Sequence, residues 1–241
     1  MKHFFHILMS GIVCAAGLSC SVSAVETEEM IVGVTAASQS VVIQDFPLIY
    51  QEPELPTGCE ITAMTMVLNY YGLNADKVNM ALEYLPVLYD EGFYYGEDGR
   101  LFGNDMENYF IGDPATSTGY ICGPGAIVTA ANRYLSETGS LLRAVNMTGI
   151  SAGELYELID QDIPIVIWGT IGMEERGEVN GWYREDGVFM DWSNNDHGTV
   201  LIGYTGSTVV LADPVLGYYE IAKDDFEDVY KSRGCKCVIL R

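Results

Sequence analysis

The sequence predicts an α+β fold, in which a mainly helical first half packs on one side of an antiparallel sheet formed by the second half. Two observations support this prediction. Apolar residues recur at helical spacing in several segments before residue 160, whereas short runs with strong strand propensity prevail after it. No internal repeat or low-complexity tract is evident in the sequence, so we expect one folded domain over residues 41–241.

The clearest predicted helix begins near Cys59 and ends at Gly72. Thr57 is a suitable N-cap residue with Glu60 three positions later, as in a capping box. The apolar residues of this segment repeat at helical spacing: Ile61, Met64, Val67, Leu68 and Tyr71. Three more helices are expected, over residues 75–85, 125–134 and 152–160.

Strands are expected over residues 141–145, 163–170, 199–204, 208–212 and 238–240. The turn residues Thr205-Gly206-Ser207 separate the third strand from the fourth, which predicts an antiparallel hairpin there. Residues 89–119, in contrast, are rich in Gly, Asp, Asn and aromatic residues without a clear period. They are expected to form a long surface excursion that would line a site.

The first 24 residues have the composition of a secretory signal peptide. Lys2 precedes an apolar run over residues 7–17, and the run is followed by the small residues Val22-Ser23-Ala24. The chain is therefore expected to be secreted. No apolar run is long enough to predict a membrane span, and Gly17 stands where a lipid anchor at Cys20 would require leucine. Residues 25–40 are polar and small and predict a flexible lead-in.

The charge balance is strongly acidic. The chain has 34 Asp and Glu against 12 Lys and Arg, and loss of Lys2 with the signal peptide gives 11 − 34 = −23. Nucleic acid and anionic membrane surfaces are therefore not expected as partners. The charge agrees with a protein that stays soluble outside the cell, and a preference for basic substrates is a second interpretation.

Histidine and cysteine usage limits the possible chemistry. His197 is the one histidine after residue 24, which argues against catalytic zinc, since such sites usually need two or three histidines. Four cysteines remain after residue 24, too few for a disulfide framework, and Cys235-x-Cys237 lacks further zinc ligands. The acidic residues between 90 and 107 match no calcium-binding loop. We expect no metal and no cofactor.

Cys59 is the candidate nucleophile. It lies in the first turn of the predicted helix, where unpaired N–H groups and the helix dipole favour a thiolate. By position alone, a structural thiol buried under the helix is an equally good interpretation. The residues that can join Cys59 decide between the two.

His197 and Asp213 are the candidate base and its orienting carboxylate. His197 precedes one strand of the predicted hairpin and Asp213 closes the other, so antiparallel pairing would bring them together. A carboxylate in that place fixes the imidazole tautomer, leaving the other ring nitrogen for a nucleophile. Read in isolation, Asp213 is a capping residue before Pro214.

Gln51 is the candidate oxyanion donor. It lies eight residues before Cys59, across a proline-containing turn that could fold its amide back to the helix start. Its side chain and the Cys59 backbone N–H would then form a hole with two donors for a tetrahedral intermediate. The alternative is an ordinary exposed loop glutamine.

These motifs, with Gly112-Asp113-Pro114, Gly123-Pro124, the strand Pro164-Ile165-Val166-Ile167-Trp168 and Asp213-Pro214 in order, resemble a known family. The segment from Gln51 to Glu60, followed by Leu68-Asn69-Tyr70-Tyr71-Gly72, is similar to the opening of the bacterial peptidase family thirty-nine-like proteins, relatives of domains that trim double-glycine leader peptides. The resemblance covers roughly residues 41 to 240.

The resemblance implies a papain-like fold with Cys59 as nucleophile, His197 as base, Asp213 as orienting carboxylate and Gln51 as oxyanion donor. Leader trimming does not carry over, because the relatives that trim leaders are fused to a membrane transporter and this sequence contains none. The sequence also reads His197-Gly198-Thr199 where the family more often has small apolar residues after the histidine.

Three functions are compatible with these residues. The leading prediction is a secreted cysteine peptidase that cleaves peptide or protein substrates through a thioester acyl-enzyme. The second is an acyltransferase or amidase that uses the same residues on a cell-wall or small-molecule amide. The third is a secreted binding module without turnover, against which the presence of all four candidate residues argues.

Overall fold

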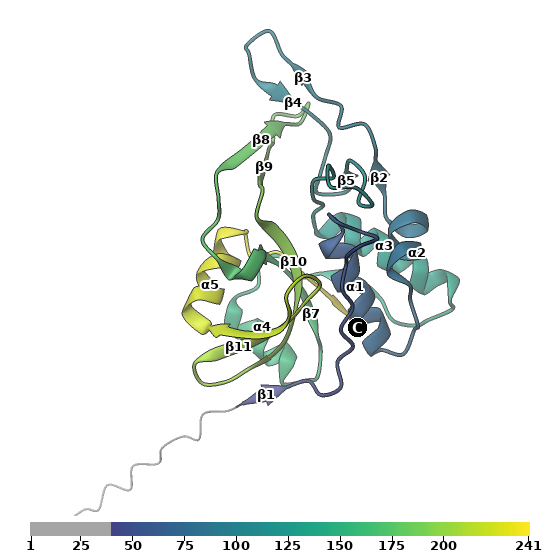
Figure 1. The fold of residues 1–241 in the computed structure, drawn as a ribbon, viewed down its shortest axis with the longest axis vertical. Coiled ribbons are helices and arrows are strands. Elements are labelled where there is room, and N and C mark those ends of the chain that lie inside the picture. Colours follow the sequence, from purple (N-terminus) through teal and green to yellow (C-terminus); the bar gives the residue numbers. More distant parts are fainter. Residues whose placement is uncertain (1–39) are drawn as a thin grey trace, which may run out of the picture. The chain divides into compact units, whose positions relative to one another are not determined.

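The structure, a computed structural model, describes residues 40–241. A seven-stranded antiparallel sheet lies at the centre of this part (Figure 1). Its main path runs β12 (Gly217–Ala222), β11 (Thr208–Asp213), β10 (Asp196–Tyr204), β7 (Ile165–Thr170), β13 (Cys237–Leu240) and β6 (Ala144–Asn146), and β1 (Val41–Val42) also pairs with β10. The predicted α+β class is confirmed. The predicted signal peptide and nearly all of the predicted lead-in lie outside the described residues.

The helices cover both faces of the sheet (Figure 1). On one side lie α1 (Cys59–Tyr70), the short α2 (Lys77–Asn79), which continues into a π-helical turn (Met80–Tyr84), and α3 (Pro124–Glu137). On the other side lie α4 (Ala152–Ile159) and α5 (Lys223–Ser232), so the prediction that the helices pack on one side of the sheet is wrong. Sequence reasoning missed α5, which has few apolar residues and buries only Phe226, Val229 and Tyr230.

Helix α1 lies inside the molecule rather than on its surface. Every residue from Cys59 to Leu68 is buried, and the helix packs on β10 and β7. Its two buried threonine hydroxyls are satisfied locally, because Thr62 donates to Gly58 O at 2.8 Å and Thr65 to Ile61 O at 2.7 Å. A helix buried on all sides holds its first residue rigidly, and that residue is Cys59.

The predicted capping of α1 is wrong in one respect. Gly58, not Thr57, occupies the N-cap position, and no side chain caps the helix. The Thr57 hydroxyl donates instead to Thr116 O at 3.0 Å, which ties the start of α1 to the following excursion. This long-range hydrogen bond takes the place of the predicted capping bond from Thr57.

The β10–β11 hairpin is confirmed. Val200 pairs with Ala212 and Leu201 with Leu211, and a bulge follows before Gly203 pairs with Val210. On its other side, β10 pairs with β7 over six residues, from Asp196 opposite Thr170 to Leu201 opposite Ile165. The strand that begins beside His197 is thus held between two neighbours.

The excursion over residues 89–119 contains more structure than its composition predicted. Strands β3 (Tyr94–Tyr95) and β4 (Leu101–Phe102) join β8 (Val179–Tyr183) and β9 (Phe189–Ser193) in a separate four-stranded sheet, and β5 (Phe110–Ile111) pairs with β2 (Val87–Leu88). Strands of two residues show no period in a sequence, which explains the omission. The small sheet extends away from the central one (Figure 1).

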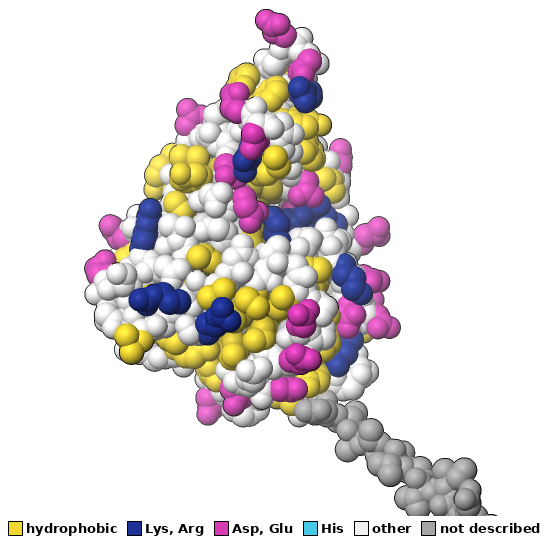
Figure 2. Space-filling model, turned by 180° about the vertical axis from the view of Figure 1, so that it is seen from behind, with side chains coloured by type: hydrophobic (Ala, Val, Ile, Leu, Met, Phe, Trp, Pro, Cys, Tyr) yellow, Lys and Arg dark blue, Asp and Glu magenta, His cyan; other side chains and the backbone are white. Residues whose placement is uncertain are grey.

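The face shown in Figure 2 carries acidic side chains scattered widely rather than gathered into one patch. Among residues 40–241, no helix has the length and apolar character to cross a membrane.

A glycine in β10 sets how closely α1 approaches the sheet. A Cβ atom at Gly198 would lie 2.9 Å from the Cα atom of Glu60 and 2.8 Å from its Cγ atom. Real Cβ atoms do not come this close to backbone, so any larger residue would push α1 away from the sheet.

We therefore expect Gly198→Ala to lower the free energy of unfolding by about 1–3 kcal/mol, the usual effect of overpacking a core. Urea denaturation measures the change. Gly153→Ala in α4 is the matched control, because the nearest atom to its added Cβ is at 3.8 Å, and we expect no loss of stability there. Equal losses in both variants would contradict this account of the contact.

Candidate active site

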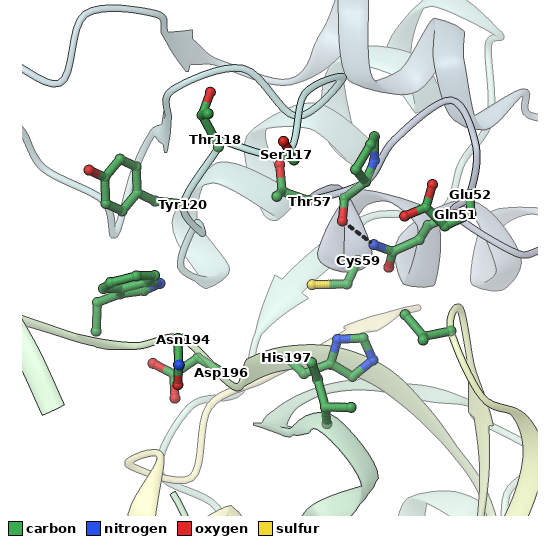
Figure 3. Close-up of a pocket in the computed structure, with 15 residues that line it drawn as sticks. Gln51, Glu52, Thr57, Cys59, Ser117, Thr118, Tyr120, Asn194, Asp196 and His197 are labelled. Atoms are coloured by element: carbon green, nitrogen blue, oxygen red, sulfur yellow. Dashed lines mark hydrogen bonds between the residues drawn. The ribbon is translucent and has the colours of Figure 1, made fainter. Parts of the chain in front are cut away.

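Cys59 opens α1 at the edge of a cleft with a volume of about 630 Å³ (Figure 3). As the first residue of the helix, it leaves its backbone N–H without an acceptor inside the helix. Cys59 is 7% exposed, and its sulfur accepts a hydrogen bond from the Gly198 N–H at 3.4 Å. Cys59 therefore lines the cleft with a thiol and with a backbone N–H that makes no hydrogen bond inside the helix.

The environment of Cys59 favours a neutral thiol at rest. Burial raises the pKa of the Cys59 thiol well above its usual value, and the negative charges of Glu60 and Asp213 raise it further. The Gly198 N–H opposes this shift only in part. Sequence reasoning expected the helix start to favour a thiolate, but desolvation outweighs that effect. Attack by Cys59 consequently requires a base beside it.

His197 and Asp213 form a buried pair at one end of the hairpin. The Nε2 atom of His197 lies 2.9 Å from Oδ2 of Asp213, and both side chains are almost completely buried. The second carboxylate oxygen accepts the backbone N–H groups of Val215 at 2.8 Å and Leu216 at 3.0 Å. Three donors therefore fix this carboxylate in place.

The Asp213 carboxyl is ionised and sets the tautomer of the imidazole. Burial alone would raise the pKa of Asp213, but the hydrogen bond and charge of His197 and the N–H groups of Leu216 and Val215 lower it below its usual value. An ionised carboxylate only accepts hydrogen bonds, so Nε2 of His197 carries a proton and Nδ1 is left to act as a base. The imidazole lies beside the Cys59 side chain in the cleft (Figure 3).

Gln51 lies next to Cys59, in the loop before α1 (Figure 3). Its side chain is buried, and one N–H of its amide donates to Pro56 O at 2.7 Å. The backbone N–H of Gln51 donates to Pro214 O at 2.9 Å, which joins this loop to the turn that follows Asp213. An amide nitrogen has a second hydrogen, which is available to a substrate oxygen.

The structure thus brings together all four residues singled out from the sequence. Cys59, His197 and Gln51 line one cleft, and Asp213 lies behind the histidine. The cleft is lined by Gln51, Glu52, Pro56, Thr57, Cys59, Ser117, Thr118, Gly119, Tyr120, Ile171, Trp192, Asn194, Asp196, His197 and Val215. Residues 117–119 show that the excursion contributes one wall, as expected.

The two ends of the cleft differ in character. Tyr120 and Trp192 form an aromatic wall, with ring centroids 5.2 Å apart, beyond Cys59 in the direction away from Gln51. Glu52 lies at the opposite end, beside Gln51 (Figure 3). The residues lining the cleft include no lysine or arginine. No cluster of potential metal ligands occurs in the described residues.

Sequence reasoning missed a charge network beside His197. The side chain of Asp196 is buried, and its two oxygens accept hydrogen bonds from Arg176 Nε at 2.9 Å and Nη2 at 2.8 Å. Arg233 Nη2 lies 3.1 Å from the same carboxylate. The network anchors the first residue of β10, next to the histidine. Its arginines are far from Asp196 in sequence and match no motif, so only the structure could reveal them.

Glu60 is a second residue whose environment the sequence did not reveal. Its side chain is fully buried, and neither carboxyl oxygen has a hydrogen-bond partner within the described residues. Burial raises the pKa of Glu60 to about 7. The sequence predicted only a capping-box role for Glu60, but its side chain lies inside the protein, against β10.

The raised pKa of Glu60 predicts a loss of stability as pH rises. Between its unfolded pKa near 4.5 and its folded pKa near 7, the unfolded chain releases this proton and the folded chain keeps it. The free energy of unfolding of the parent should fall from pH 5 to pH 8, and that of Glu60→Gln should not fall for this reason. We therefore expect the difference between the two proteins to grow by roughly 2–3 kcal/mol from pH 5 to pH 8, in favour of Glu60→Gln. Urea denaturation at both pH values measures the difference. A difference between the two proteins that does not change with pH would contradict the burial of an ionisable carboxyl at this position.

The central sheet, the buried α1 and the cysteine and histidine in one cleft define a papain-like protein. The model of the Peptidase_C39 like family matches residues 43–238, and the chain belongs to that family.

The chain is also similar to individual proteins. The chain is 27% identical to the uncharacterized protein YvpB of Bacillus subtilis (strain 168) over 194 residues, which is 78% of this chain and 71% of that protein. It is 28% identical to the uncharacterized protein MTBMA_c00490 of Methanothermobacter marburgensis over 131 residues, 52% of this chain and 89% of that one. A crystal structure described as a C39-like peptidase from Bacillus anthracis superposes with a TM-score of 0.73 at 27% identity, covering 84% of this chain and 98% of that one.

Proposed function

We propose that the protein is a secreted cysteine peptidase that cleaves peptide bonds through a thioester formed on Cys59. The observation that carries this proposal is the convergence of Cys59, Gln51 and the hydrogen-bonded pair His197–Asp213 at one cleft. Membership of the peptidase family supports a peptide as the substrate class. The pattern of residues 1–24 supports secretion.

The first half of the reaction transfers the acyl group to the enzyme. Nδ1 of His197 takes the thiol proton while the Cys59 sulfur attacks the carbonyl carbon of the substrate. The carbonyl electron pair moves to oxygen, which accepts hydrogen bonds from the Cys59 N–H and the Gln51 amide. When the intermediate collapses, the C–N bond breaks and the departing amine takes the proton from His197. Because the resting thiol is neutral, proton transfer accompanies attack.

The second half of the reaction releases the acyl group. His197 removes a proton from water as the water attacks the thioester carbonyl, and the same two donors bind the oxyanion. Breaking the C–S bond gives a carboxylic acid, and the sulfur regains its proton from His197. Asp213 stays ionised throughout and stabilises the imidazolium that forms in each half.

The cleft of about 630 Å³ beside Cys59 is the proposed binding site for the peptide. Its aromatic wall of Tyr120 and Trp192 suits an apolar side chain on one side of the scissile bond.

Water competes with other acceptors for the thioester, so product analysis with added amines distinguishes hydrolysis from acyl transfer.

Selective alkylation tests whether Cys59 is the activated thiol. With limiting iodoacetamide near pH 7.5, we expect Cys59 to react first, since its base lies beside it and it faces the cleft. Loss of a general base usually lowers rates by about 10²–10⁴-fold, so we expect His197→Ala to slow this labelling by at least about tenfold. Peptide mapping by mass spectrometry identifies the modified cysteine.

Cys122 provides the matched control. It is also a buried free thiol, but it does not line the cleft. We expect Cys59→Ala to abolish cleavage of fluorogenic peptides from a mixed-sequence library and Cys122→Ala to retain it. Labelling of Cys122 as fast as Cys59, or cleavage that survives in Cys59→Ala, would refute the proposal.

A further inference from the structure

Lys77 is the first residue of α2, and its ammonium group is surrounded by oxygens of the loop that carries Gln51. Its Nζ atom donates to three consecutive backbone carbonyls: Tyr50 O at 2.5 Å, Gln51 O at 2.8 Å and Glu52 O at 3.3 Å. A lysine ammonium has three hydrogens. Three carbonyl oxygens from one short stretch of chain therefore share these hydrogens with the Glu54 carboxylate.

A carboxylate completes this shell. Oε2 of Glu54 lies 2.7 Å from Lys77 Nζ, and the hydrogen bond from Lys77 holds the pKa of Glu54 below its usual value. The Lys77 side chain is only 13% exposed although it carries a charge. An ammonium withdrawn this far from water is stabilised by its partners, which makes the contact more than a mobile surface ion pair.

The backbone of Lys77 is held in place as well. Asp76 caps the short helix by accepting the Asn79 N–H at 2.9 Å, so Lys77 leaves the backbone from a defined helix start. At its other end, the lysine reaches a loop that belongs to no helix or strand and contains Pro53 and Pro56. It thus links a capped helix to a segment with few backbone bonds of its own.

The position of the Gln51 amide depends on that segment. Gln51 O accepts both Lys77 Nζ and the Leu55 N–H, at 2.8 Å and 3.0 Å, and its N–H donates to Pro214 O. An oxyanion donor must be held within about 0.5 Å of its productive place to be effective. Among the described residues, Lys77 is the side chain that binds the Gln51 backbone.

We propose that Lys77 is a positioning residue for the oxyanion hole, holding the backbone of residues 50–52 so that the Gln51 amide meets the oxyanion. This inference rests on the proposed function. Lys77 does not touch the substrate, because it does not line the cleft. It acts through Gln51.

The test compares Lys77→Met, which keeps the apolar stem and removes the donors, with the parent. We expect kcat for peptide cleavage to fall by about 10–100-fold, below the loss for removing an oxyanion donor outright, with KM nearly unchanged. Affinity for a peptide aldehyde, whose adduct with Cys59 has a tetrahedral oxygen, should fall in parallel. Alkylation of Cys59 by iodoacetamide should keep its rate, because no oxyanion forms in that reaction.

A double-mutant cycle with Gln51→Ala shows whether Lys77 acts through Gln51. In the Gln51→Ala background, we expect Lys77→Met to lower kcat less than threefold, because the positioned donor is already gone. Lys231→Met is the matched control: this exposed lysine forms ion pairs with Glu227 and Asp228 in α5, and kcat should not change. Should Lys77→Met fail to fold, Lys77→Arg keeps the charge and should give an intermediate loss of kcat with unchanged alkylation.

Three results would overturn the inference. The first is losses of kcat that multiply fully in the double mutant, and the second is a parallel loss of alkylation and cleavage, which would indicate a structural role. An unchanged kcat in Lys77→Met, while Gln51→Ala is impaired, would overturn it as well. If the parent protein cleaves no peptide and Gln51→Ala changes nothing, the proposed function itself fails, and that outcome is distinct.

Discussion

The hydrogen bond between His197 and Asp213 depends on the pairing of β10 with β11, and much of the site depends on that bond. Antiparallel pairing places the start of one strand beside the end of the other, so the two residues meet although 16 positions separate them. The turn after Asp213 supplies two N–H groups to the carboxylate and one carbonyl to Gln51. One hairpin therefore orients the imidazole and also helps to place the oxyanion donor.

The other half of the site comes from α1, which is buried against one face of the central sheet. Because α1 is buried on all sides, the Cys59 thiol is desolvated and its pKa is raised, and this makes a nearby base necessary. The close contact between Gly198 and Glu60 brings the helix start to β10, and the same glycine donates to the sulfur. Packing and chemistry are thus coupled at one residue, and the Peptidase_C39 like fold provides both.

The sequence predicted the parts of this arrangement that rest on local patterns. The apolar period of residues 61–71 predicted α1. The turn Thr205-Gly206-Ser207 predicted the hairpin, and the hairpin in turn predicted that His197 and Asp213 lie side by side. It could not predict contacts between distant segments. These include the hydrogen bond from Thr57 to the excursion and the ion pairs of Asp196 with Arg176 and Arg233. The hydrogen bonds from Lys77 to the carbonyls of residues 50–52 are a further example. Short strands such as β3 and β4 have no detectable period, and α5 has too few apolar residues to stand out.

The central claim is that Cys59 forms a thioester with the acyl part of a peptide substrate. Intact-protein mass spectrometry after rapid acid quenching tests it directly, with an activated peptide ester as substrate so that release of the acyl group limits turnover. The account predicts a mass increase equal to the acyl group, mapped to Cys59, lost on treatment with hydroxylamine and missing in Cys59→Ala. An adduct on another residue, or turnover of the ester without any dependence on Cys59, would contradict it.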